Sequence, residues 1–333
     1  MRAVVLVGGF GTRLRPLTND LPKQMLPIVG IPMIERVVSA LGGHGVTEAV
    51  LSLGYRPDAF LDAYPDGVCG GVQLHYAVEP EPLDTAGAVR FAARSAEIDD
   101  TFIVVNGDVL TDLDVTALWD FHKGHGAEGT IALTPVDDPS RYGVVPIDDD
   151  GRVIEFVEKP APGTAPTNWI NAGTYVLEPA VLDRIAADRK VSIERETFPA
   201  VVSERGLFAL HSDAYWIDAG TPETYLRAQL DLIDGTRSNE PAVLTSDSID
   251  TTSRIENSVL GADVVIGNGA VVRNSVLMDG VTVGPGVRIH DSIVASGAWI
   301  GPDSSIDGLS VIGARQQVPA RSELVGVRMP GSD

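Results

Sequence analysis

A fixed repeat in the C-terminal third is the feature that most constrains the fold. Aliphatic residues recur there with spacings of 6, 6 and 5, so the set repeats every 17 positions through four turns: Ile249, Ile255, Leu260; Ile266, Val272, Leu277; Val283, Ile289, Val294; Ile300, Ile306, Val311. Glycines (Gly267, Gly284, Gly301) and serines (Ser258, Ser275, Ser292) keep the same register. A helix would give a period of about 3.6, and an ordinary sandwich would hold no fixed period. The repeat therefore predicts a parallel β-helix of hexapeptide type, with the aliphatic residues stacked inside.

The preceding residues, 1–235, alternate short apolar runs with helical patterns. Strands are expected at Ala3–Val7, Ala49–Leu53, Gln73–Val78 and Phe102–Val105, and helices around Ile34, Val37, Val38 and Leu41 and over Ala86–Ala96. Such alternation predicts an α/β, Rossmann-like, mainly parallel sheet covered on both faces, with ligands bound at the carboxyl ends of its strands. The polar stretch 235–239 separates the two regions. We expect domains at 1–235 and 240–326.

Charge and composition narrow the class of partner. The net charge of −21 argues against nucleic acid and anionic membranes as partners. The chain holds no apolar run long enough to span a membrane, and its start is too quickly glycine-rich for a signal peptide. With Cys69 as the single cysteine, no internal disulfide is expected, and the cytoplasm is the expected compartment.

A glycine-rich loop follows the first expected strand. Residues 8–18 read G-G-F-G-T-R-L-R-P-L-T, and residues 21–27 read L-P-K-Q-M-L-P. The loop matches neither the dinucleotide fingerprint nor the Walker loop. Glycines allow close approach of backbone N–H groups to a polyphosphate, and Arg13 and Lys23 add two cations. Taken alone, the segment remains equally open to a second interpretation, a turn with two solvated basic residues.

Two acidic residues suggest a metal. Asp108 follows the buried strand 102–105, at the end where a sheet of this kind binds ligands. Asp218, within Y-W-I-D-A-G-T-P, by itself favours a turn or helix N-terminus over a ligand. No Ser-His-Asp set is apparent, and His122 and His125 are expected to be solvated residues near a helix C-terminus.

Together these segments resemble the sugar-phosphate nucleotidyltransferases, whose signature is G-G-x-G-T-R-L-x-P-L-T followed by P-K-x-[ML]-[LV]-P. The resemblance covers essentially the whole chain and implies a left-handed β-helix at the C-terminus. It also implies that the loop holds a triphosphate, that Arg13 supports the departing pyrophosphate and that Lys23 contacts the phosphates. Asp108 in N-G-D and Asp218 in W-x-D-x-G would bind Mg²⁺ together. The attacking phosphate oxygen is already anionic, so no general base is needed.

Further motifs match the family's substrate contacts. The E-K-P, N-A-G and Y-G-V motifs imply that sugar phosphate is bound by Gly143, Glu158, Lys159, Asn171 and Gly173. Without the surrounding pattern, Glu158 and Lys159 would be an exposed ion pair. The remaining motifs imply a nucleotide site formed by Leu6, Gly8, Gly9, Gly11, Thr12, Arg13, Lys23, Glu79, Asp84 and Thr85. The chain departs from the family pattern at Asp84, which replaces the glycine whose backbone normally contacts the base.

Two features indicate guanine and mannose. A carboxylate such as Glu79 only accepts hydrogen bonds, and guanine offers two adjacent donors. Residues 192–199 read S-I-E-R-E-T-F-P, which resembles mannose-1-phosphate guanylyltransferases. The expected reaction is GTP plus mannose 1-phosphate giving GDP-mannose and pyrophosphate.

Alternatives remain open for the substrate and for the activity. Glucose 1-phosphate with UTP or dTTP, or a heptose phosphate, would keep the same chemistry. A catalytically inactive regulatory subunit would lack a key side chain, but Arg13, Lys23, Asp108 and Asp218 are all present. A β-helix acyltransferase would need a histidine, and only His290 lies in the repeat. We expect the β-helix instead to mediate homo-oligomer formation.

Overall fold

The computed structural model describes residues 1–54, 57–187, 189–242 and 248–331. By internal contacts the chain divides into two compact units. Unit 1 comprises Met1–Gly9 and Ile34–Trp216, and unit 2 comprises Phe10–Met33 and Ile217–Asp333. Residues 243–247 of the expected second domain lie outside the described residues. Among the described residues, no helix is long and apolar enough to cross a membrane.

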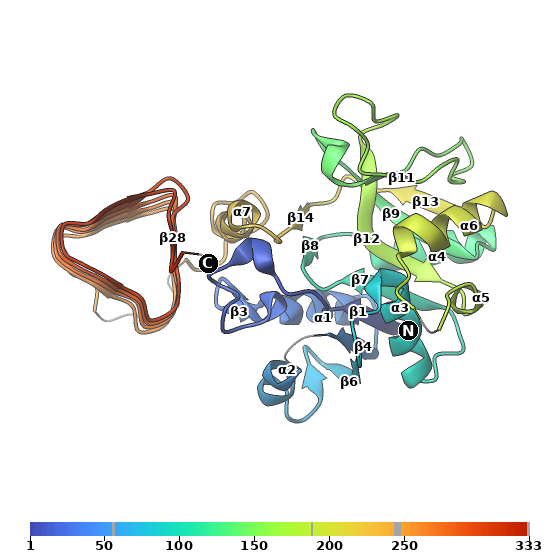
Figure 1. Ribbon diagram of the computed structural model, residues 1–333, viewed down its shortest axis with the longest axis horizontal. Helices are drawn as coiled ribbons and strands as arrows, with labels where there is room; N and C mark the ends of the chain where they lie inside the picture. The colour runs from blue at the N-terminus through green and yellow to red at the C-terminus, as the bar shows by residue number, and fades with distance from the viewer. Residues whose placement is uncertain (55–56, 188, 243–247, 332–333) are drawn as a thin grey trace. The chain divides into compact units, whose positions relative to one another are not determined.

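Unit 1 is built on a mixed sheet in the order β11-β10-β12-β7-β1-β4-β6-β5, with β9 beside β12 and β13 beside β9 (Figure 1). Its central strands are parallel to one another: β1 (Arg2–Leu6), β4 (Glu48–Leu53), β6 (Val72–Val78) and β7 (Phe102–Asn106). All four were predicted from apolar runs and begin and end within one residue of prediction. The flanking strands are β5 (Val68–Cys69), β9 (Gly129–Pro135), β10 (Gly143–Val144), β11 (Val157–Glu158), β12 (Trp169–Leu177) and β13 (Leu207–His211). Because β12 runs antiparallel to β7 and to β9, whereas β13 runs parallel to β9, the sheet is mixed beyond its parallel centre.

The helices of unit 1 bury the apolar stripes predicted for them. Helix α1 (Met33–Gly43) buries Ile34, Val38 and Leu41, and α3 (Asp84–Ser95) packs on β1, β4 and β6 (Figure 1). The other helices are α2 (Asp58–Ala63), α4 (Val115–His125), α5 (Ala180–Asp183), α6 (Phe198–Ser203), the 3-10 helix η3 (Pro139–Arg141) and the π-helix η4 (Ile193–Thr197). The α3 face and the inner face of β12 meet in one apolar core. This core holds the strand ends, and the loops that follow them, in fixed positions.

The prediction that His122 is solvated is wrong. Its side chain is fully buried, with Nδ1 2.8 Å from Thr130 Oγ1 and Nε2 3.2 Å from Glu178 Oε1. Burial lowers the pKa of His122 below its ordinary value. His125, in contrast, is exposed, and its ring lies 2.8 Å from the Phe121 carbonyl near the helix end at Gly126.

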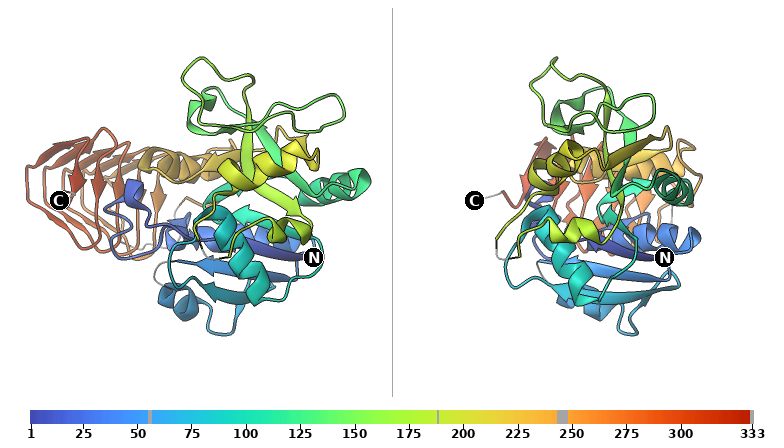
Figure 2. Two further views of the ribbon diagram at one scale, coloured as in Figure 1. Left: turned by 45° about the vertical axis from the view of Figure 1, so that its right-hand side comes forward. Right: turned by 90° about the vertical axis from the view of Figure 1, so that its right-hand side faces the viewer.

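The repeat in unit 2 forms three parallel sheets, as in a left-handed β-helix. Figure 1 shows its coils end-on as a triangle, and Figure 2 shows them stacked. The sheets are β15-β18-β21-β24-β27 (Arg254–Glu256, Val271–Arg273, Arg288–His290, Ser305–Asp307, Glu323–Val325), β16-β19-β22-β25-β28 (Val259–Leu260, Val276–Leu277, Ile293–Val294, Val311–Ile312, Arg328–Met329) and β17-β20-β23-β26 (Val265–Ile266, Thr282–Val283, Trp299–Ile300, Gln317–Val318). Strand partners keep the predicted period through the first coils, as in Ile255↔Val272↔Ile289. The predicted glycine positions admit no side chain, since a Cβ on Gly284 would lie 2.8 Å from the Pro302 nitrogen.

The repeat does not keep this period to the end. Val294 pairs with Ile312, not with the predicted Val311, so this step is longer than those of the first coils by a single position, as are the steps from Ile300 to Val318 and from Ile306 to Leu324. The extra residue lies within Asp307–Leu309, because Ile306 still pairs with Ile289 whereas the Ile293 amide donates to the Ser310 carbonyl as the Val276 amide does to that of Ser292. Gly308 and Leu309 both adopt left-handed backbone, with φ of 64° and 61°. As a result Ile312 joins the central aliphatic column, while Val311 is also buried but pairs with Ile293.

The remainder of unit 2 anchors the segment that follows the glycine loop. It contains the 3-10 helices η1 (Thr12–Leu14) and η2 (Lys23–Met25), the hairpin β2 (Pro27–Ile28) and β3 (Ile31–Pro32), and α7 (Pro222–Ile233). Buried Gln229 of α7 accepts from the Val29 amide at 2.7 Å and donates to the Pro27 carbonyl at 2.9 Å. Tyr225 donates to the same carbonyl. These bonds tie the chain beyond Lys23 to the helix that follows Asp218.

Candidate functional site

Asp108 lies just beyond the carboxyl end of β7. That strand pairs with β1, which places Leu6 opposite Asn106. The Gly107 amide donates to the Leu6 carbonyl at 2.9 Å, and a Cβ on Gly107 would lie 2.8 Å from Val7 Cγ1. Only glycine fits this close approach, so the turn carries Asp108 out beside the end of β1, with its side chain half-buried. Asp108 thus occupies the strand end where the sequence placed it.

The Glu79 carboxylate is fixed at the end of β6. Its Oε1 accepts from Ser52 Oγ at 3.1 Å and its Oε2 from the Leu83 amide at 2.9 Å, and the residue is 9% exposed. A Cβ on Gly8 would lie 4.0 Å from Glu79 Oε1, so the first glycine of the loop borders this carboxylate. Each carboxylate oxygen has two acceptor positions, which leaves capacity for a ligand's donors.

The segment after Glu79 is fastened to residues 191–194. Val191 bonds through its backbone to Leu83 and to Ala86, and the Ile193 amide donates to Thr85 Oγ1 at 2.8 Å. The Thr85 hydroxyl in turn donates to Glu194 Oε2 at 2.8 Å. In the sequence, the S-I-E motif served only as an indication of the substrates, GTP and mannose 1-phosphate. The structure shows that Glu194 also supports the predicted base-binding segment.

Asp84 itself adopts left-handed backbone, with φ of 63°. Its Oδ1 accepts from the Thr85 amide at 2.8 Å, a local bond that makes this conformation tolerable for aspartate. The backbone at Asp84 therefore has a left-handed conformation that glycine adopts most readily.

This geometry makes a testable prediction for stability. Asp84→Ala loses the local hydrogen bond and keeps the left-handed strain, whereas Asp84→Gly loses the bond but relieves the strain. We expect the alanine variant to have a free energy of unfolding about 1 kcal/mol lower than that of the glycine variant, measured by urea denaturation. Equal stabilities would contradict a left-handed backbone at this residue.

The predicted sugar-phosphate residues gather around β10, β11 and β12. Gly143 pairs with Glu158, and a Cβ on Gly143 would lie 3.1 Å from Glu158 Oε2. Lys159 Nζ lies 3.3 Å from Glu158 Oε1, with the lysine side chain 59% exposed and the glutamate 21%. The two side chains therefore differ in exposure: the Glu158 carboxylate is held inward, and the Lys159 ammonium faces solvent.

Asn171 and Gly173 form a second cluster on β12. Asn171 donates to the Tyr175 hydroxyl at 2.9 Å and accepts from the Gly173 amide at 2.9 Å. Gly173 has φ of 74°, and a Cβ there would lie 2.5 Å from Asn106 Nδ2. Burial, and then the charges of Glu194 and Glu158, raise the pKa of Tyr175. The Tyr175 hydroxyl thus stays neutral and accepts the hydrogen bond from Asn171.

Unit 2 holds the remainder of the glycine loop. Gly11 has φ of 58°, and a Cβ there would lie 2.9 Å from Thr18 Cγ2 and 3.2 Å from Lys23 Cβ. The Thr18 hydroxyl donates to the Gly11 carbonyl at 2.8 Å. The loop therefore folds back onto the segment that carries Lys23, which is half-buried, while Thr12 and Arg13 are exposed.

Arg13 and Asp218 meet at Gly220. A Cβ on Gly220 would lie 2.7 Å from Asp218 Oδ1 and 2.8 Å from Arg13 Nη2. The Gly220 amide also donates to Asp218 Oδ1 at 2.9 Å, which confirms the turn that the sequence suggested. A cation and a half-buried carboxylate are thus brought to one glycine, an arrangement suited to a polyphosphate and its metal.

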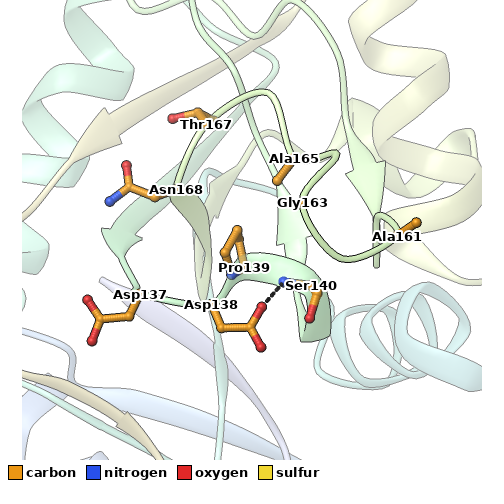
Figure 3. A pocket seen from close by; sticks show the side chains of 9 residues that line it. All are labelled: Asp137, Asp138, Pro139, Ser140, Ala161, Gly163, Ala165, Thr167 and Asn168. Carbon is orange, nitrogen blue, oxygen red and sulfur yellow. Dashed lines mark hydrogen bonds between the residues drawn. The ribbon is translucent and has the colours of Figure 1, made fainter.

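Unit 1 contains a hollow of about 420 Å³, whose lining side chains are drawn in Figure 3. It lies between η3 and the loop that follows β11. Its lining residues are Asp137, Asp138, Pro139, Ser140, Ala161, Gly163, Ala165, Thr167 and Asn168. Asp138 caps η3 by accepting from the Ser140 amide at 3.0 Å. None of the residues singled out from the sequence lines this hollow.

Comparison with known families gives two matches that divide the chain. A model described as nucleotidyl transferase matches residues 2–235, and a model described as the GMPPB C-terminal domain matches residues 239–327.

Two named relatives are 43% and 40% identical to this chain over the matched residues. Mannose-1-phosphate guanylyltransferase of Mycobacterium tuberculosis is 43% identical over 235 residues, which are 70% of this chain and 65% of that protein. Mannose-1-phosphate guanylyltransferase 1 of Arabidopsis thaliana is 40% identical over 285 residues, 82% of this chain and 78% of that protein. The match thus spans just under two thirds of the mycobacterial protein.

A solved structure shares the fold of part of the chain. HddC from Yersinia pseudotuberculosis, complexed with GMP-PN, is 34% identical with a TM-score of 0.58, and the match covers 68% of this chain and 97% of that chain.

Proposed function

Because the chain belongs to the nucleotidyl transferase family, we propose that it joins GTP to mannose 1-phosphate, forming GDP-mannose and releasing pyrophosphate. An oxygen of the sugar phosphate attacks the α-phosphorus of GTP, and the bond from that phosphorus to the bridging oxygen of the pyrophosphate breaks. The nucleophile is anionic before the reaction. The protein therefore has to align the two phosphates and neutralise their charge.

The phosphate side of the proposal rests on the glycine loop. Backbone amides of Gly8, Gly9, Gly11 and Thr12 would contact the triphosphate, since glycine permits the close approach. Arg13 would neutralise the charge that develops on the departing pyrophosphate, and Lys23 would contact the phosphates as a point charge. The contact of Arg13 with the Gly220 turn supports this role, because it limits the positions of an otherwise exposed guanidinium.

Asp108 and Asp218 are the proposed ligands of Mg²⁺. Both are half-buried carboxylates, and this is the donor type that Mg²⁺ takes together with phosphate oxygens and water. When bound, the ion would supply positive charge to the phosphate oxygens. The chain's own contribution is the turn at each carboxylate: Gly107 before Asp108 and Gly220 after Asp218.

Guanine recognition is assigned to Glu79, with Leu6, Asp84 and Thr85 beside the base. One observation carries this choice: the Glu79 carboxylate is held by Ser52 and Leu83 and still has acceptor positions to spare. The N1–H and N2–H groups of guanine are adjacent donors that match a carboxylate, whereas uracil and thymine offer one imide donor. The relatives named as guanylyltransferases and the HddC complex with GMP-PN agree with this choice.

The sugar phosphate is assigned to Gly143, Glu158, Lys159, Asn171 and Gly173. Glu158, the less exposed member of its ion pair, would accept hydrogen bonds from sugar hydroxyls, and the exposed Lys159 would contact the phosphate.

We also propose a homo-oligomer formed through the β-helix, since Val265 and Trp299 are 40% and 38% exposed on one of its sheets. Sedimentation equilibrium would test the oligomer. The expected cytoplasmic setting stays a proposal.

Initial rates of pyrophosphate release test the reaction. The purified chain with Mg²⁺ is assayed with GTP, UTP, dTTP and ATP, each against mannose 1-phosphate and glucose 1-phosphate. We expect the highest kcat/KM for GTP with mannose 1-phosphate. Highest activity for dTTP or UTP with glucose 1-phosphate would keep the chemistry and overturn the assignment of Glu79. No release with any pair would favour a regulatory subunit.

A further inference from the structure

The β-helix touches the glycine loop through its last coils. Arg328 Nη1, on β28, donates to the carbonyl oxygen of Arg13 at 2.9 Å and to that of Arg15 at 3.3 Å. Arg315 forms a 2.7 Å ion pair with Asp20. A Cβ on Gly313 would lie 3.1 Å from Pro16 Cβ and 3.0 Å from the Met329 carbonyl, so the coil and the loop are in close contact there.

The two carbonyls that accept from Arg328 lie at the end of η1. In a helix of this kind the last carbonyls have no partner within the helix, and a cation at that end satisfies them favourably. The Arg15 amide closes η1 by donating to the Thr12 carbonyl at 3.3 Å. Arg328 therefore completes the C-terminal end of the short helix that contains Arg13.

Arg13 is thereby constrained at both ends. Its main-chain carbonyl is held by Arg328, and its guanidinium lies against the Gly220 turn beside Asp218. Leu14, the next residue, is fully buried and prevents the helix from rotating freely. The direction in which the Arg13 side chain leaves the backbone consequently depends on a residue of the β-helix.

From these contacts we infer that Arg328 is a positioning residue for Arg13, and that the β-helix is part of the nucleotidyl transfer apparatus. The expected effect of Arg328 on the reaction rate rests on the proposed function. The support that Arg328 gives to the backbone of the loop, here called the bracing, is independent of the substrate. Arg328 touches no reacting atom in this account. It acts by fixing the backbone that carries the arginine.

The contacts differ in how much each contributes. The Arg315–Asp20 pair is between side chains that are 74% and 55% exposed, and exposed pairs contribute little. Arg328 is also exposed, but its guanidinium donates to two carbonyls of the same helical turn. Both hydrogen bonds can be kept only while that turn keeps its conformation. Arg328 is thus the residue whose loss loosens the loop most.

Hydrogen exchange followed by mass spectrometry tests the bracing directly on the full chain. In Arg328→Ala we expect amides in the peptide covering residues 10–20 to exchange about tenfold faster, with the coils through β26 unchanged. Arg315→Ala should have a smaller effect. Arg288→Ala, which removes an exposed arginine on β21, is the matched control and should leave loop exchange unchanged.

The same variants then separate the two proposals. We expect Arg328→Ala to lower kcat about tenfold with KM for the sugar phosphate unchanged, and Arg328→Lys to recover part of the loss. Unchanged exchange and unchanged kcat in Arg328→Ala would overturn the inference. Faster exchange over residues 10–20 in a chain without transferase activity would support the bracing and contradict the proposed function alone. Faster exchange throughout the β-helix would mean that Arg328→Ala unfolds the last coils. Exchange over residues 10–20 would then be measured in Arg328→Gln, which retains one donor group, and that result would decide whether the inference holds.

Discussion

Replacing Arg13 with alanine is expected to lower kcat for pyrophosphate release about a thousandfold, because arginines that neutralise a departing phosphate group have effects of this order. The free energy of unfolding should change by less than about 0.5 kcal/mol, since the side chain is exposed. Initial rates with the preferred substrate pair and urea denaturation measure the two quantities. A large loss of rate without loss of stability is the signature of a side chain that acts on the reaction.

Two further variants sharpen this test. Arg13→Lys retains the charge but not the planar fork, and we expect it to recover about a tenth of the lost activity. Arg227→Ala removes an exposed arginine of α7 in the same unit and should leave kcat within about twofold, because Arg227 has no proposed contact with a substrate. An Arg13→Ala variant that retained more than about a tenth of the wild-type rate would contradict the proposed role.

Substitution of the two carboxylates should be strongly non-additive. Asp108→Asn and Asp218→Asn are each expected to lower kcat by about 10²–10³, because a neutral amide is a poor ligand for Mg²⁺. If both side chains hold one ion, the double variant should be no more than about tenfold worse than either single one, since residues that act as a unit lose their effect together. Initial rates over a range of Mg²⁺ concentrations measure each variant.

The control for this cycle is Asp120→Asn, which removes an exposed carboxylate from α4. It should leave the Mg²⁺ dependence unchanged. Fully additive losses in the double variant would mean that Asp108 and Asp218 contribute independently, which would exclude a shared ion.

The elements of the fold were predictable wherever one apolar pattern dominated. The strands of the central sheet are continuous aliphatic runs, and the β-helix repeats its aliphatic residues every 17 positions. The longer step near the end was missed because Val311 and Ile312 are both aliphatic, and either fits the column. The insertion lies within Asp307–Leu309, and the glycine there, Gly308, is one of many glycines at the corners. His122 was also within reach of the sequence, since it follows Val115 and Leu118 at helical spacing and so shares their buried face.

The proposed site residues come from motifs in the sequence, whereas the contacts that support them could not be predicted. Arg13, Lys23 and Asp108 lie in short segments whose residues are adjacent in the chain. Glu194 bonds to Thr85 across 109 residues, and Arg328 bonds to Arg13 across 315 residues. No pattern in one sequence links residues so far apart. Such pairs depend on tertiary packing, and a structure is needed to find them.

A single competition experiment tests the central claim most directly. The chain and Mg²⁺ are incubated with equal concentrations of GTP, UTP, dTTP and ATP, together with carbon-13-labelled mannose 1-phosphate and unlabelled glucose 1-phosphate, and the products formed early are identified by mass spectrometry. Product ratios then report the ratios of kcat/KM. The account predicts labelled GDP-mannose as the main product. A predominance of unlabelled UDP-glucose or dTDP-glucose would contradict it.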